Sequence, residues 1–148
     1  MSFNAEQFMS TIVKGAFDTK TVPIPEGEYP GTITKLDLRE VKTKNGDRII
    51  LEVTWEITDE EVEKVTNRDK NYARQSIWLD VTPEGALSER KGTNIGLGRL
   101  REAIGQNNPD KDWNMPQLVG ASAMVSIKHR LNETTGEVYG EVGSVRPF

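Results

Sequence analysis

Tyr72, Arg74 and Trp78 have the side-chain types and spacing to bind unpaired nucleic-acid bases. They occupy even positions of an alternating segment, so a strand would present all of them on one face. Aromatic rings stack on bases regardless of sequence, and each stack contributes roughly 1–3 kcal/mol. The residues of opposite parity are apolar: Ile77, Leu79 and Val81. That parity predicts the core face, so we expect Trp78 to point outward as a stacking residue. The alternative is that the N-terminal arm or a partner subunit covers its ring.

Basic residues occur in two further places where they could contact phosphates. One group surrounds a predicted turn, the other precedes the turn at 133–136, and Tyr139 follows that second turn as an additional ring. Each phosphate that a lysine or arginine neutralises releases counterions and favours binding. The basic residues are Lys42, Lys44, Arg48, Lys128 and Arg130. The alternative interpretation is that these charges form ordinary solvated surface.

Signs of catalysis are weak. His129 is the sole histidine and has no nucleophile or carboxylate at a suitable spacing. The Gly-Leu-Gly at 96–98 lacks the lysine and the preceding strand of a phosphate loop. Glu52, Glu56 and Asp80 would lie on one side of adjacent strands and could hold a divalent ion, which leaves a metal-dependent nuclease as a minor hypothesis. We expect no catalytic residues, no metal site and no cofactor.

The composition of this 148-residue chain favours one globular domain. The absence of cysteine excludes disulfides and cysteine-ligated zinc. No apolar run approaches the roughly 18 residues of a membrane span, and the N-terminus lacks signal-peptide features. We therefore expect a cytoplasmic location and no membrane partner. The formal net charge of −4 does not exclude nucleic acid as a partner, because a basic stripe can lie on an acidic protein.

The elements that must position these residues follow the order strand, strand, strand, helix, strand, strand. The predicted strands are 28–42, 49–58, 72–82, a strand through Ala123, Val125 and Ile127, and 137–145, with the helix at 94–105. This order is typical of the OB-fold, a five-stranded all-β Greek-key barrel that commonly binds oligonucleotides on strands 2 and 3 and on adjoining loops. We predict an arm and lead-in over 1–27, and an OB-fold domain over 28–148 with one short helix between strands 3 and 4.

Several details of these elements can also be predicted. The parity of the apolar residues changes between Ile33 and Leu36, which indicates a bulge in the first strand. The Asn-Gly at 45–46 predicts a hairpin turn. Strict alternation over 49–58 places Trp55 in the core and Ile50 on the opposite face. The charged segment 59–71 indicates an irregular connection, and Trp113 is expected to cover one end of the barrel.

The arm carries its own apolar pattern. Phe8, Met9, Ile12 and Val13 would share one side of a short helix that Gly15 ends. Such an unpartnered apolar side makes the arm a candidate for contacts between copies of the chain.

Taken in order, these segments resemble a family of small phage-encoded proteins found with recombination and replication genes and regarded as single-stranded-DNA-binding proteins. The resemblance lies in Thr19-Lys20, the 23–29 segment PIPEGEY, the 44–46 turn KNG, the helix 97–105 ending in Ala-Ile-Gly, the 118–120 segment LVG and the 145–147 ending VRP. It implies an OB-fold, single-stranded DNA as the ligand, and phage replication or recombination proteins as partners. Many such proteins end in a flexible acidic tail with an aromatic tip, whereas this chain has only the terminal Phe148.

Two main hypotheses follow. The first is a non-enzymatic protein that coats single-stranded DNA, without sequence preference, in phage replication or recombination. The second is a phage structural or assembly protein that uses the Trp78 surface and the arm for subunit contacts.

Overall fold

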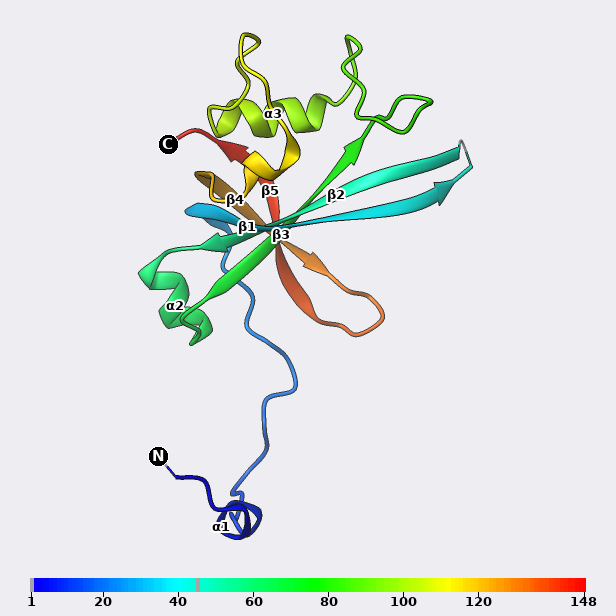
Figure 1. Ribbon diagram of the computed structural model, residues 1–148. Helices are drawn as coiled ribbons and strands as arrows, with labels where there is room; N and C mark the ends of the chain where they lie inside the picture. The colour runs from blue at the N-terminus through cyan, green and yellow to red at the C-terminus, as the bar shows by residue number, and fades with distance from the viewer. Residues whose placement is uncertain (1, 45) are drawn as a thin grey trace.

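Over residues 2–44 and 46–148, which the computed structural model describes, most regular structure is β and closes into a five-stranded barrel (Figure 1). The strands are β1 Gly27–Thr43, β2 Gly46–Ile57, β3 Asn71–Leu79, β4 Ser122–Leu131 and β5 Val138–Arg146. They follow the order β1-β2-β3-β5-β4 around the ring. Neighbouring strands are antiparallel, except that β3 and β5 are parallel and pair at Arg74 and Glu141. The prediction of an all-β, five-stranded barrel is confirmed, and the closure of the ring is an additional finding.

The strictly alternating strand β2 contributes the centre of the core. Its inward residues are buried: Leu51, Val53, Trp55 and Ile57. The inward residues of β4 are buried in the same way: Ala123, Val125 and Ile127. The indole N–H of Trp55 donates to Gln75 Oε1 at 3.0 Å, which satisfies the one polar atom of this buried ring. The predicted core position of Trp55 is confirmed.

Two residues differ from expectation in how far they are buried. Ile50 has the outward parity of β2, yet it is only 4% exposed, because Arg39 on β1 and Trp78 on β3 flank it across the sheet. Val81 was expected on the inner face of the third strand, but β3 ends at Leu79 and Val81 is 38% exposed. Beyond the end of the strand, alternation no longer determines which way a side chain points.

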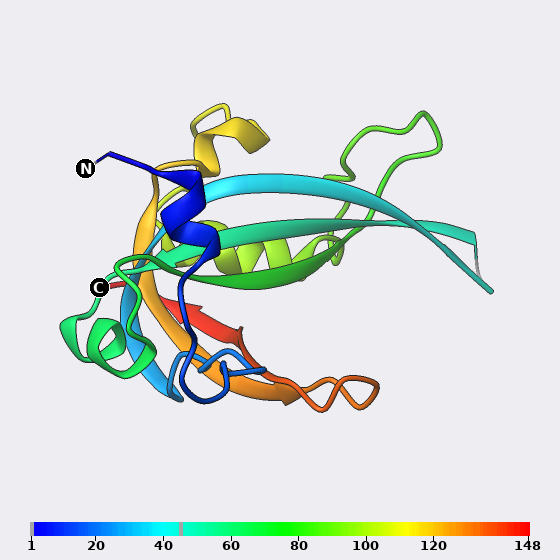
Figure 2. The same cartoon turned by 90° about the horizontal axis from the view of Figure 1, so that it is seen from below.

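The β1–β2 hairpin projects well beyond the barrel (Figures 1 and 2). β1 pairs with β4 only over Gly27–Thr32, whereas its pairing with β2 continues to Thr43. The register shifts between Ile33 and Lys35, which confirms the predicted bulge and lets β1 leave the barrel. Asn45 of the predicted Asn-Gly turn lies outside the described residues.

Helix α3, Ile95–Ala103, lies between β3 and β4 where the sequence predicts a helix. It buries Leu97, Leu100 and Ala103, and Gly105 with φ 73° follows its end. The 3₁₀ helix η1, Met115–Leu118, buries Leu118, and Trp113 packs against the core just before it.

The prediction of a single helix is wrong, because helix α2, Glu60–Thr66, lies between β2 and β3. The Asp59 side chain accepts a hydrogen bond from the Val62 N–H at 3.1 Å, as an N-cap does. Glutamates fill the first turn, where the helix dipole favours negative charge. Val62 is buried, and Asn67 ends the helix in the left-handed conformation with φ 56°.

The N-terminal arm extends away from the barrel (Figure 1). Its helix α1 covers only Ala5–Met9, so Ile12 and Val13 lie beyond the helix rather than on it as predicted. The lead-in to β1 is tied down by side chains of the barrel. Glu137 accepts hydrogen bonds from Thr21, and the His129 ring nitrogen Nε2 donates to the Ile24 carbonyl at 2.8 Å. In the described part of the chain, no helix has the length and apolar character needed to cross a membrane.

Candidate functional site

The outer face of β3 brings together the residues that the sequence singled out. Tyr72, Arg74, Ser76 and Trp78 pair with Glu56, Thr54, Glu52 and Ile50 of β2, respectively. Tyr72 is 50% exposed and Trp78 is 48% exposed, so both rings are available to a ligand. The predicted outward position of Trp78 is confirmed.

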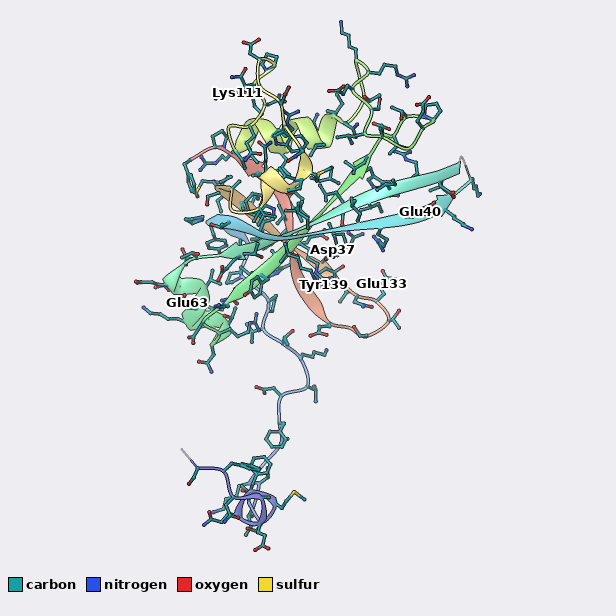
Figure 3. All side chains as sticks on the ribbon, in the orientation of Figure 1. Asp37, Glu40, Glu63, Lys111, Glu133 and Tyr139 are labelled. Carbon is teal, nitrogen blue, oxygen red and sulfur yellow. The ribbon has the colours of Figure 1, made fainter. Side chains whose placement is uncertain are left out.

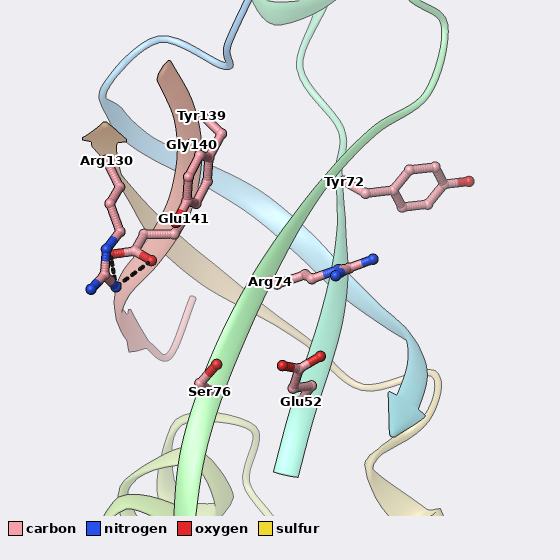
Figure 4. A pocket seen from close by; sticks show the side chains of 8 residues that line it. All are labelled: Glu52, Tyr72, Arg74, Ser76, Arg130, Tyr139, Gly140 and Glu141. Carbon is pink, nitrogen blue, oxygen red and sulfur yellow. Dashed lines mark hydrogen bonds and ion pairs between the residues drawn. The ribbon is translucent and has the colours of Figure 1, made fainter. Parts of the chain in front are cut away.

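A groove of about 460 Å³ crosses β3 between β2 and β5 (Figure 4). Figure 4 shows Tyr72 and Arg74 extending from β3 to one side, with Arg130, Tyr139 and Glu141 gathered on the other. The lining residues are Glu52, Tyr72, Arg74, Ser76, Arg130, Tyr139, Gly140 and Glu141. The structure therefore brings four predicted site residues, from three strands, into one groove.

A second hollow of about 480 Å³ adjoins the first along β3. The two hollows share Ser76, and the second contains Trp78, Gly143 of β5 and Arg99 of α3. The two hollows meet at Ser76 and lie along β3 between Tyr72 and Trp78, and we call them together the β3 groove. Arg99 was not predicted, because only the packing of α3 beside β3 and β5 places it there.

Trp78 sits in a partly charged environment. The Arg48 guanidinium carbon lies 5.2 Å from the Trp78 ring centroid, close enough for a cation–π interaction. Arg48 Nη2 also lies 3.9 Å from Asp80 Oδ1. Asp80 is fixed in turn by Asn94, whose backbone N–H donates to Asp80 Oδ2 at 2.8 Å. The predicted phosphate ligand Arg48 is thus held beside the predicted stacking ring.

Arg130 is ion-paired with a carboxylate that lines the same groove. Arg130 Nη1 lies 3.2 Å from Glu141 Oε2, and the pair is drawn with dashed lines in Figure 4. The hydrogen bond to Glu141, together with the charge of that carboxylate, raises the pKa of Arg130 above its usual range. Arg74, which lines the same groove from β3, forms no ion pair with any described residue.

None of the predicted lysines is among the residues that line the β3 groove. Lys42 and Lys44 are exposed near the end of the projecting hairpin, and neither forms an ion pair within residues 2–44 and 46–148. Lys128 is on β4, and its side chain passes close to Gly143 of β5, where an added Cβ would come within 2.9 Å of the Lys128 Cδ. Glycine at this position therefore leaves room for the lysine stem to lie across β5 beside the second hollow.

The carboxylates proposed for a metal site are not brought together. Among the described side chains, no group of His, Cys, Asp or Glu could hold a metal ion. Glu52 instead lies 3.3 Å from Arg39 Nη2, and Asp80 contacts Arg48 and Asn94.

Glu141 and Arg99 line the groove although no sequence pattern singled them out, whereas Ser76 shares the alternating positions of Tyr72 and Trp78 on strand 3. Glu141 could have been identified as lying two residues after Tyr139 on the same strand face, but its partner Arg130 depends on the β4–β5 register.

Comparison with protein-family models gives no match for this chain, and comparison with curated proteins gives none either.

Proposed function

We propose that this protein binds single-stranded DNA along the β3 groove. The observation that carries the proposal is that Tyr72, Tyr139 and Trp78, each about half exposed, line the two adjoining hollows of the β3 groove together with Arg74. Half-exposed rings have a free face for stacking, and a base stacked on an aromatic side chain contributes roughly 1–3 kcal/mol. Such binding depends little on sequence, because every base has a stacking face.

We further propose that the barrel is an OB-fold. The ring order β1-β2-β3-β5-β4 and helix α3 between β3 and β4 support this assignment. OB-folds commonly bind oligonucleotides on strands 2 and 3, between the loops that join strands 1 and 2 and strands 4 and 5. The β3 groove, the β1–β2 hairpin and the β4–β5 turn occupy the corresponding positions here. The resemblance in sequence supports a role in phage replication or recombination within the host cytoplasm, with other phage proteins as partners and without catalysis.

The groove has the dimensions of a short stretch of single strand. Trp78 follows Tyr72 by six positions on β3, and at about 3.3 Å per residue the two rings are separated by roughly 20 Å along the strand. That distance lets the two rings contact different bases of one strand. Between them lies Arg74, which is free to contact a phosphate.

Fluorescence anisotropy with labelled oligo-dT, and with a labelled duplex of equal length, tests this proposal. We expect saturable binding of oligo-dT and much weaker binding of the duplex, whose bases are stacked internally. Binding to neither nucleic acid would refute the proposed function. Equal binding to both would show that phosphate contacts, and not base stacking, provide the affinity.

The arm favours self-association as a second candidate function. Its exposed apolar side chains are Phe3, Phe8, Met9, Ile12, Val13 and Phe17. At about 150–250 Å² for each aromatic side chain, the three phenylalanines alone expose about 330–550 Å², a large part of the ~800 Å² that each partner buries in a standard interface. Packing against another copy would bury this surface, as a structural or assembly protein requires.

Sedimentation velocity on the full chain tests this second function. We expect an assembly larger than one chain, and a monomer when Phe8, Ile12 and Phe17 are all replaced by serine. A monomeric unmodified chain at tens of micromolar would exclude the arm as a strong subunit contact.

A further inference from the structure

We propose that Glu141, Glu52 and Asp80 are internal counter-ions of the β3 groove, which the phosphates of single-stranded DNA must displace from arginines. This inference rests on the proposed function and concerns how strongly and how selectively the groove binds. It assigns to the carboxylates a role that opposes binding.

The first observation is the pairing of arginines around the aromatic path. Arg130 lies 3.2 Å from Glu141, and Arg39 lies 3.3 Å from Glu52. Arg48, beside the Trp78 ring, lies 3.9 Å from Asp80. In each pair the carboxylate oxygen stands where a phosphate oxygen could bind the guanidinium.

The second observation is that these ion pairs are solvated. Their side chains are between 24% and 63% exposed, so neither charge is trapped in the protein interior. Exposed pairs contribute little free energy, because water and salt screen them. A phosphate can therefore exchange with a carboxylate at small cost, but the displaced carboxylate remains nearby and repels the DNA backbone.

The consequence is a groove whose attraction for phosphate is reduced. Arg74 and Arg99 form no ion pair among the described residues, whereas Arg39, Arg48 and Arg130 are each paired with a carboxylate. A ligand must then gain most of its affinity from stacking, which duplex DNA cannot supply. Elements that penalise the wrong ligand give specificity as effectively as contacts to the right one.

Glu141 is the best residue for a test. In the described structure its carboxylate is hydrogen-bonded only to Arg130, so the glutamine substitution disturbs no other polar contact. Glu133 provides a matched control on the same β4–β5 hairpin. Figure 3 labels Glu133 and Tyr139 on this hairpin, and the carboxylate of Glu133 has no hydrogen-bond or ion-pair partner among the residues described.

The experiment measures the Kd of labelled oligo-dT for the unmodified chain, Glu141→Gln and Glu133→Gln over a series of salt concentrations. We expect Glu141→Gln to tighten binding by about 1.5-fold to 5-fold, the range for releasing one exposed ion pair. Its log Kd should also depend more steeply on log salt, by up to about 0.7 for one additional phosphate contact. Glu133→Gln, with the same change in net charge, should alter both quantities much less.

Arg130→Gln completes a double-mutant cycle. It should weaken binding only slightly in the unmodified chain, and should abolish the gain when combined with Glu141→Gln. Equal affinities for Glu141→Gln and Glu133→Gln, or a gain that survives Arg130→Gln, would overturn the inference while leaving the proposed function intact. No binding of oligo-dT by the unmodified chain would overturn both. If Glu141→Gln does not fold, Glu52→Gln must show the same tightening.

Discussion

Trp78→Leu is expected to separate base stacking from packing at the centre of the proposed interface. The Trp78 ring is 48% exposed, and its other half lies beside Ile50, which is almost completely buried. Alanine would uncover Ile50 as well as remove the stacking face. Leucine keeps apolar cover over Ile50 and has no planar ring on which a base can stack.

The expected changes in Kd and in stability follow from the exposed half and the buried half of the Trp78 ring, respectively. Losing one stacked base costs roughly 1–3 kcal/mol, which raises the Kd for oligo-dT by about 5-fold to 140-fold. The buried half of the ring amounts to roughly 100 Å². At about 25 cal/mol per Å², Trp78→Ala would then lower the free energy of unfolding by about 2.5 kcal/mol at most. Trp78→Leu should lower it by less.

Anisotropy with labelled oligo-dT gives the Kd, and chemical denaturation gives the stability of each variant. Trp113→Leu is the control, because this ring is already engaged within the protein. The Arg101 guanidinium carbon lies 4.3 Å from the Trp113 ring centroid, and the indole N–H of Trp113 donates to Gln106 Oε1. This control should leave the Kd unchanged. A Kd for Trp78→Leu equal to that of the unmodified chain would refute the assignment of Trp78 as a stacking residue.

Three further outcomes are expected. Replacing both Lys42 and Lys44 with alanine should flatten the dependence of log Kd on log salt by up to about 1.4, if each lysine neutralises one phosphate; an unchanged slope would place the phosphate contacts elsewhere. Trp55→Ala should lower the free energy of unfolding by about 3–5 kcal/mol, because it leaves a cavity in the core. Denaturant unfolding measures this change, and a loss of less than about 1 kcal/mol would contradict the core position of Trp55. The hydrogen bonds from Arg146 lower the pKa of Glu28 below its usual value. The pair therefore adds stability at pH values above the unfolded-state pKa, and this stability is lost as the pH falls through the lower folded-state pKa. Glu28→Gln should remove this part of the pH dependence of Tm, and an identical Tm profile for the variant would argue against the pair.

The strongest sequence patterns predicted the fold where local residues alone determine the structure. Strict alternation over 49–58 placed Trp55 correctly, and the parity change after Ile33 correctly indicated the bulge. The apolar spacing from Leu97 to Gly105 likewise located α3. In each case a periodic pattern and its terminating residue lie within one segment.

Helix α2 is not evident from the sequence, because its acidic residues resemble a solvated connection. Its signals were present in Asp59 as N-cap and in the spacing of Val62 and Thr66, which are both buried. With only two buried positions in seven residues, the apolar stripe is too short to stand out from the surrounding charges.

The groove itself could be predicted only in part. Parity on β3 was sufficient to align Tyr72, Arg74 and Trp78, because they share one strand. The burial of Ile50 depends on cross-strand neighbours, and the pairing of Arg130 with Glu141 depends on strand register. Such long-range register is set by the closed barrel as a whole and cannot be read from any one segment.

The most direct test of the central claim is a tryptophan-fluorescence titration of the unmodified chain with oligo-dT, repeated with a duplex of the same length. Trp55 is fully buried and Trp113 is covered by Arg101, so Trp78 should dominate the response. We predict saturable quenching by oligo-dT, none by the duplex, and loss of the quenching in Trp78→Leu. Unchanged fluorescence with oligo-dT at concentrations up to about 1 mM, where binding free energies fall to about −4 kcal/mol, would contradict the account.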